Sequence, residues 1–168
     1  MRQFPFDVEK ATEVLLYISS RCPDMYTALK ILYFADKYHL ARYGRSICGG
    51  SYAALKHGPV PSEAYDMIQF VRGDGWYCFD SRVSDALALE GNTIVGRRPA
   101  DLTYLSESDR EALDQAIGQY GPMSFGHLKA VSHADMAFQA VNENDRIPIE
   151  SIVQSLGDRE LAEYLDHQ

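Results

Sequence analysis

The sequence predicts a mainly α-helical α+β fold, a single compact domain of about seven helices with one small antiparallel β-hairpin. Three observations lead to this prediction. Apolar residues recur at helical spacing along most of the 168 residues, glycines and prolines separate these stretches, and one segment near the middle alternates instead. Because no repeat, low-complexity tract or long Gly/Ser linker divides the chain, we expect one domain over residues 1–168.

Two helices are expected at the start of the chain. Asp7 can cap the first helix, which should end before Cys22-Pro23 because a residue that precedes proline avoids the helical region. The second should run from about Tyr26 to Arg42, with Gly44 at the left-handed C-cap position. This second helix is apolar nearly all round, so we expect it at the centre of the fold.

The middle of the chain carries the β signals. Residues 51–57 alternate enough to predict a short strand or extended segment. Residues 58–61, Gly-Pro-Val-Pro, are expected to form a rigid turn that continues neither helix nor sheet, because proline lacks a backbone donor. Ser62 is a suitable N-cap for a third helix that Gly73 closes. Residues 87–95 alternate around Glu-Gly-Asn, which predicts the β-hairpin.

The second half of the chain is expected to be helical. Ser108 and Glu111 have the spacing of a capping box, and the helix they begin should end at Gly121-Pro122. Further helices are expected at about 124–132, at about 134–143, from Pro148 to Gly157, and after an Asp158 cap.

Charge and cysteine content narrow the class of protein. The chain has 16 Lys and Arg against 24 Asp and Glu, a formal charge of −8, and no clustered basic stripe, so unaided nucleic-acid binding is not expected. An acidic surface favours encounter with a basic partner. Three cysteines without CxxC spacing predict free thiols, and neither a signal peptide nor a run of 18 apolar residues is visible. We therefore expect a cytoplasmic protein that does not contact membranes.

The sequence offers little catalytic or metal chemistry. His127 and His133 are six residues apart, no HExxH or Cys/His cluster occurs, and we expect neither a metal nor a cofactor. Cys48 could form a thiolate pair with His39 or His57, but SICGGSY matches no nucleophile motif, so a buried structural cysteine is favoured. Gly49-Gly50 is expected to be a turn, because no phosphate-loop pattern surrounds it.

Asp36 is the most informative single residue, because it lies on the apolar stripe of the second helix. A buried carboxylate needs a partner, so we expect it to pair with a lysine, a tyrosine hydroxyl or backbone donors. The alternative is a polar contact for a partner protein. His39 is one turn away and could belong to the same network, together with Tyr43.

Tyrosines crowd the first third of the chain. Six of the eleven lie between residues 26 and 65, and an apolar body with a polar tip suits either the edge of a core or an interface. The candidate partner-contacting residues are Tyr33, Asp36, His39, Tyr43, Tyr52, His57, Pro59 and Tyr65.

Two blocks of this sequence resemble a known family. Residues 29–68, LKILYFADKYHLARYGRSICGGSYAALKHGPVPSEAYDMI, contain LYFAD followed by His-Leu, a glycine turn, and HGPV with a downstream tyrosine. Residues 120–140, YGPMSFGHLKAVSHADMAFQA, form the second block. Together they resemble the Panacea domain of SocA-like antitoxins and phage-associated GepA-like proteins. Phe138 stands where the family pattern has tryptophan, which removes an indole donor.

The resemblance implies an antitoxin that neutralises a cognate toxin, encoded by the adjacent gene, through direct protein–protein binding. It also suggests an alternative, a proteolytic adaptor or phage-associated regulator that delivers a partner to a ClpXP-type protease. The chain leaves no room for a separate DNA-binding domain, so autoregulation by this chain alone is not expected. A third hypothesis, a small enzyme that uses Asp36, His39 or His57, would need these side chains to meet at a cleft.

Overall fold

A computed structural model describes residues 3–167 and contains nine α-helices, one short 3-10 helix and five strands within that range. The fold is mainly helical α+β, as predicted. Its helices are α1 (Val8–Ser19), α2 (Met25–Tyr43), α3 (Ser62–Arg72), α4 (Ser81–Ala86), α5 (Glu107–Tyr120), α6 (Phe125–His133), α7 (Met136–Gln139), α8 (Ile149–Leu156) and α9 (Arg159–Asp166), with η1 (Leu102–Tyr104) before α5. The strands are β1 (Tyr52–Leu55), β2 (Gly58–Pro61), β3 (Leu87–Glu90), β4 (Thr93–Gly96) and β5 (Arg146–Ile147).

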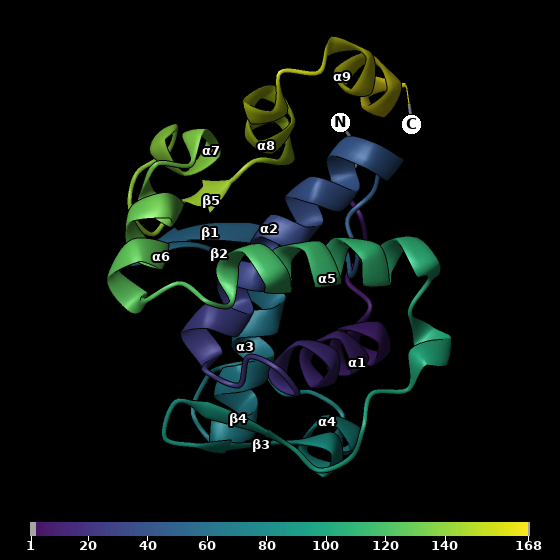
Figure 1. The fold of residues 1–168 in the computed structure, drawn as a ribbon, viewed down its shortest axis with the longest axis vertical. Helices are drawn as coiled ribbons and strands as arrows, with labels where there is room; N and C mark the ends of the chain where they lie inside the picture. The colour runs from purple at the N-terminus through teal and green to yellow at the C-terminus, as the bar shows by residue number, and fades with distance from the viewer. Residues whose placement is uncertain (1–2, 168) are drawn as a thin grey trace.

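Helix α2 lies at the centre, as its apolar circumference predicts. Figure 1 shows α5 crossing it, with α1, α3 and the β3–β4 hairpin towards one end of the molecule and α7 to α9 towards the other. Leu29 and Leu32 of α2 belong to the apolar core that includes α1, α3 and α5. Tyr33 and Leu40 belong to a second core, which includes β1, β5, α8 and α9. The helix therefore connects two packed halves.

A three-stranded antiparallel sheet, in the order β2-β1-β5, corrects one expectation. Residues 58–61 do not form a turn outside the sheet but are strand β2, which pairs Gly58 with Leu55 and Pro61 with Tyr52 of β1. The missing N–H of proline is tolerated because β2 is an edge strand, where one row of backbone groups has no ladder partner. The β3–β4 hairpin is present as predicted, with Gly91 at a positive φ in its turn.

Helix α5 begins two residues earlier than expected, because a different capping box forms. The Ser106 hydroxyl accepts a hydrogen bond from the Asp109 N–H at 3.1 Å, and the Asp109 carboxylate accepts one from the Ser106 N–H at 2.9 Å. The same Ser-x-x-acid spacing therefore works from Ser106 rather than from Ser108 with Glu111. Ser108 instead contacts His39.

Other helix ends agree with the sequence or differ by one position. Asp7, Gly44, Gly73, Gly157 and Asp158 occupy the cap positions predicted for them. Pro61 and Pro148 are the N-cap residues of α3 and α8, so Ser62 is the first helical residue rather than a cap and Pro148 precedes the first turn.

Helix α4, the 3-10 helix η1 and strand β5 were not predicted from the sequence. Helix α4 has only six residues, too few for a helical period to be visible, and Asp80 caps it by accepting from the Arg82 N–H. Strand β5 has two residues, and α7 ends at Gln139 instead of continuing to residue 143, because a turn that contains Asn144 at φ 69° leads into β5. Within residues 3–167, no helix combines the length and the apolar character needed to cross a membrane.

Candidate functional site

The structure divides the eight candidate contact residues into two groups. Five are buried in the described structure: Tyr33, Asp36, His39, Tyr52 and Pro59. The other three, Tyr43, His57 and Tyr65, are at least partly exposed. A buried side chain acts on a partner only through the segments that it holds in place.

Asp36 fastens β1 and the preceding loop to α2. Its carboxylate accepts a hydrogen bond from the Ile47 N–H at 2.8 Å and one from the Tyr52 hydroxyl at 2.7 Å. These partners are a backbone donor and a tyrosine hydroxyl, two of the three kinds predicted. Burial raises the pKa of Asp36 to about 7, although both hydrogen bonds favour the charged form. The carboxyl group is therefore close to its ionisation midpoint at neutral pH.

The loop that Asp36 holds, residues 46–50, packs against the N-terminal segment. The Asp7 N–H donates to the Cys48 carbonyl and the Gly50 N–H donates to the Phe4 carbonyl, each at 2.9 Å. Gly49 has a φ of 74°, and a Cβ there would lie 1.9 Å from the Pro5 carbonyl oxygen, so only glycine fits. Cys48 is buried as predicted, and burial raises the pKa of its thiol well above the ordinary value. A thiolate at this position is thus disfavoured.

His39 belongs to a neighbouring cluster around Asp109 rather than contacting Asp36 directly. Its Nδ1 lies 2.8 Å from the Arg45 carbonyl, so Nδ1 carries the proton and Nε2 of the neutral ring accepts from the Ser108 hydroxyl at 2.9 Å. Lys10 and Arg45 pair with the Asp109 carboxylate at 2.7 and 3.0 Å. Burial alone would raise the pKa of Asp109, but the hydrogen bonds from Lys10 and Ser106 lower it overall.

A third buried acid, Asp135, connects the two sequence blocks. The Tyr33 hydroxyl donates to one carboxylate oxygen at 2.9 Å, and Lys37 pairs with the other at 2.6 Å. Asp135 also caps α7 by accepting from the Phe138 N–H at 3.0 Å. The Phe138 ring packs against His133, with ring centroids 5.0 Å apart. The first block, on α2, is thereby tied to the second block at the start of α7.

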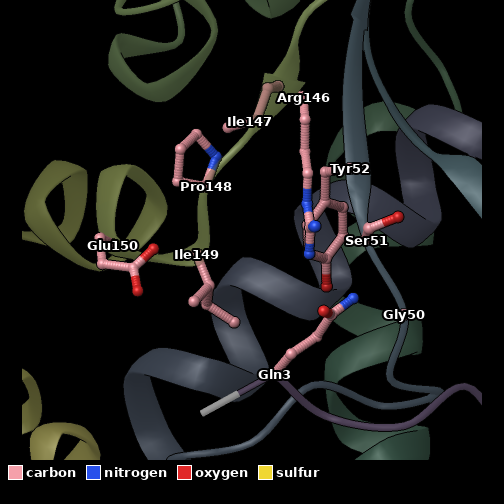
Figure 2. Close-up of a pocket in the computed structure, with 9 residues that line it drawn as sticks. All are labelled: Gln3, Gly50, Ser51, Tyr52, Arg146, Ile147, Pro148, Ile149 and Glu150. Atoms are coloured by element: carbon pink, nitrogen blue, oxygen red, sulfur yellow. The ribbon is translucent and has the colours of Figure 1, made fainter. Parts of the chain in front are cut away.

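A pocket of about 330 Å³ with mixed polar and apolar walls lies beside Tyr52. Figure 2 shows its walls, formed by β1, by β5 with the start of α8, and by the N-terminal segment at Gln3. Arg146 and Glu150 are its ionisable side chains apart from Tyr52 itself. Tyr52 therefore has two environments, because its hydroxyl binds Asp36 while the residue lines this pocket.

Comparison with known protein families gives a match over the region that contains most of these contacts. Residues 29–138, well over half of the chain, match the family described as "Antitoxin SocA-like, Panacea domain". The chain belongs to this Panacea family. No curated protein and no solved structure matched the chain. In this Panacea protein, the family match extends from α2, through the Asp36 and Asp109 networks, to Asp135 and Phe138.

The structure does not bring together the three side chains of the enzyme hypothesis. Asp36 and His39 are buried on the C-terminal half of α2. His57 packs beside Tyr26 at the other end of this helix, where the Tyr26 hydroxyl donates to the His57 carbonyl at 2.7 Å. Tyr26 and His39 are separated by 13 residues of helix, which corresponds to about 20 Å. Within residues 3–167, no group of three His, Cys, Asp or Glu side chains is arranged to hold a metal ion.

An exposed aromatic segment is the feature of this Panacea protein that the sequence reasoning missed. The loop from Gly73 to Asp80 joins α3 to α4, and within it Trp76 is 99% exposed and Tyr77 63% exposed. Cys78 is exposed beside them. The available signal was the single tryptophan of the chain placed between glycines and acidic residues, in GDGWYCFD, where no apolar periodicity demands burial.

Proposed function

We propose that this chain is an antitoxin that neutralises a cognate toxin, encoded by the adjacent gene, by direct protein–protein binding in the cytoplasm. The action needs neither catalysis nor direct contact with nucleic acid. The family match supports the class of function, and the almost complete exposure of Trp76 supports binding as the mode of action. Exposed tryptophan has a large energetic cost in water that burial against a partner removes.

The Trp76 loop has the properties of an interface anchor. Its two ends are fixed, since Gly73 closes α3 and Asp80 caps α4, so the loop is presented from a rigid base. Tryptophan and tyrosine are the residue types enriched among side chains that dominate binding energy. A loop that places Trp76 and Tyr77 together therefore suits an apolar cleft on a partner.

Charge complementarity favours a basic toxin. The chain carries a net charge of −8, and Asp74 lies within the loop itself. An acidic protein accelerates encounter with a basic partner, while buried aromatic contacts determine how long the complex lasts. The expected toxin surface is consequently a cationic patch around an apolar cleft.

Co-expression tests the proposal. The product of the adjacent gene is expressed in bacteria alone, with the wild-type chain, and with Trp76→Ala. We expect growth arrest, rescue, and loss of rescue, respectively. Met136→Ala is the matched control, because Met136 is a large apolar side chain that is 67% exposed on a different element, α7. Failure of the wild-type chain to restore growth would contradict the proposal.

Affinity capture distinguishes neutralisation from delivery to a protease. Neutralisation predicts recovery of the adjacent gene product in a stoichiometric complex. Recovery of a ClpXP-type protease without the adjacent gene product would instead favour the adaptor function and contradict neutralisation by binding.

A further inference from the structure

A second pocket, of about 360 Å³, lies between α2, α3 and the β1–β2 turn. This volume falls in the range of sites that bind small molecules. Most of its lining is apolar or aromatic: Met25, Tyr26, Leu29, Leu55, Val60 and Tyr65. The ionisable side chains of its lining, besides the two tyrosines, are Lys30 from α2, Lys56 and His57 from the turn, and Glu143 from the segment before β5.

Lys30 is the unusual member of this lining. The residue is 1% exposed, its Nζ donates to the Pro59 carbonyl at 2.6 Å, and it lies 5.0 Å from the centre of the Tyr26 ring. An ammonium group has three donors, and no carboxylate pairs with this one within the described part of the chain. Burial lowers the pKa of Lys30 to about 7. A buried amine that contacts one neutral acceptor and the face of an aromatic ring, but no carboxylate, stabilises the folded state poorly.

His57 provides a second, independent observation. Its Nδ1 is buried and has no hydrogen-bond partner among the residues that the structure describes. Burial lowers the pKa of His57, and neighbouring positive charges lower it further, from Lys129, Lys56, Lys30 and His133. Several basic side chains therefore act on His57 together, on a chain whose net charge is −8.

Gly58 allows Lys30 to approach the turn. A Cβ at Gly58 would lie 3.3 Å from Lys30 Nζ and 2.8 Å from Ser132 Cβ, and its φ of 117° also favours glycine. The turn therefore has no side chain where the amine is held. A neutral apolar residue in place of Lys30 would suit packing alone better. An amine with unused donors at the wall of a pocket therefore suggests a ligand that accepts from it.

We propose that this pocket binds a small carboxylate with an apolar body, whose carboxylate group occupies the unused donors of Lys30 beside His57 while a ring or short alkyl chain fills the apolar part. A charged hydrogen bond in an apolar site is strong because solvent is excluded. Glu143 on the lining disfavours a second negative charge, so a monoanionic carboxylate fits better than a phosphate. This site is separate from the Trp76 loop and does not depend on the antitoxin proposal.

Titration of the full chain with phenylacetate and with phenylacetamide, followed by amide chemical shifts, tests the site. The two probes have the same ring, but only the acid carries charge. We expect saturable shifts at Gly58 and around Lys30, with a dissociation constant of about 1 mM for phenylacetate and at least about tenfold weaker binding of the amide. Equal affinity for both probes, or no saturable shift at Gly58 with phenylacetate, would overturn the proposal.

Two variants locate the charge that is responsible. Lys30→Met keeps a long apolar side chain and should lose the preference for the acid. Arg42→Gln removes one positive charge from an exposed position on the same helix and should keep it. Retention of the preference in Lys30→Met would contradict the role of Lys30. If Lys30→Met does not fold, the comparison of acid and amide on the wild-type chain decides.

Discussion

Tyr52→Phe removes a single hydroxyl from the network that holds β1 to α2. This hydroxyl donates to the Asp36 carboxylate at 2.7 Å in a buried environment, and the carboxylate has a pKa of about 7 in the folded chain. A hydrogen bond to a charged group contributes about 1.5–3 kcal/mol, whereas one between neutral groups contributes about 0.5–1.5 kcal/mol. The loss of stability should therefore depend on pH.

The direction follows from the raised pKa of Asp36. Asp36 releases its proton near pH 3.8, its ordinary pKa, in the unfolded chain and near pH 7 in the folded chain. Between these pH values the unfolded state therefore binds fewer protons, and the free energy of unfolding falls as pH rises. The Tyr52 hydroxyl offsets part of this fall by stabilising the charged carboxylate. Tyr52→Phe should cost about 2–3 kcal/mol at about pH 8.5 and only about 1 kcal/mol at about pH 5.

Urea unfolding followed by circular dichroism at both pH values measures the difference. Tyr164→Phe is the matched control, because Tyr164 is 54% exposed on α9. Removal of its hydroxyl group should change the free energy of unfolding by no more than about 0.5 kcal/mol. An equal loss at both pH values for Tyr52→Phe would contradict this prediction, since it would mean that the ionisation of Asp36 does not strengthen this hydrogen bond.

The remaining predictions concern glycines and the buried lysine. Gly49→Ala should destabilise the chain by about 3 kcal/mol, because its Cβ would clash with the Pro5 carbonyl at a positive φ, and thermal unfolding would detect this as a clear drop in Tm. Gly118→Ala, on an open face of α5, should stabilise by about 0.5–1 kcal/mol, and a lower Tm would contradict that. Burial lowers the pKa of Lys30 to about 7 from the ordinary 10.5, so the stability of the wild-type chain should rise with pH between these values. In urea unfolding, Lys30→Met should show a weaker dependence of stability on pH and should be more stable than wild type at about pH 7, by about 1–3 kcal/mol. Parallel profiles for the two chains would show that Lys30 does not titrate there.

Local signals predicted most of the helical framework. The continuous apolar surface from Tyr26 to Arg42 identified α2 as central, and single residues such as Gly44 and Asp158 marked helix ends because capping depends on neighbours a few positions away. The same reasoning failed for residues 58–61, since whether a proline can join a sheet depends on which strand lies at the edge. Edge position is a property of the whole fold.

The sequence predicted that Asp36 would be buried and paired, but it did not predict which residues surround His39. Burial of Asp36 required donors, and a tyrosine hydroxyl and a backbone N–H supply them. Residue spacing could not predict that Asp109 lies at the centre of the His39 cluster. Lys10, Arg45 and Asp109 come together only after α1, α2 and α5 have packed. Trp76 was missed for the opposite reason, since an exposed side chain leaves no periodic pattern.

Binding between the purified chain and the purified product of the adjacent gene is the decisive measurement for an antitoxin that acts by direct contact. Isothermal titration should give a stoichiometric complex whose dissociation constant rises at least about thirtyfold with Trp76→Ala, which corresponds to about 2 kcal/mol, while Met136→Ala stays close to wild type. The absence of any complex with the wild-type chain would contradict the account of this Panacea protein as an antitoxin that acts by direct contact.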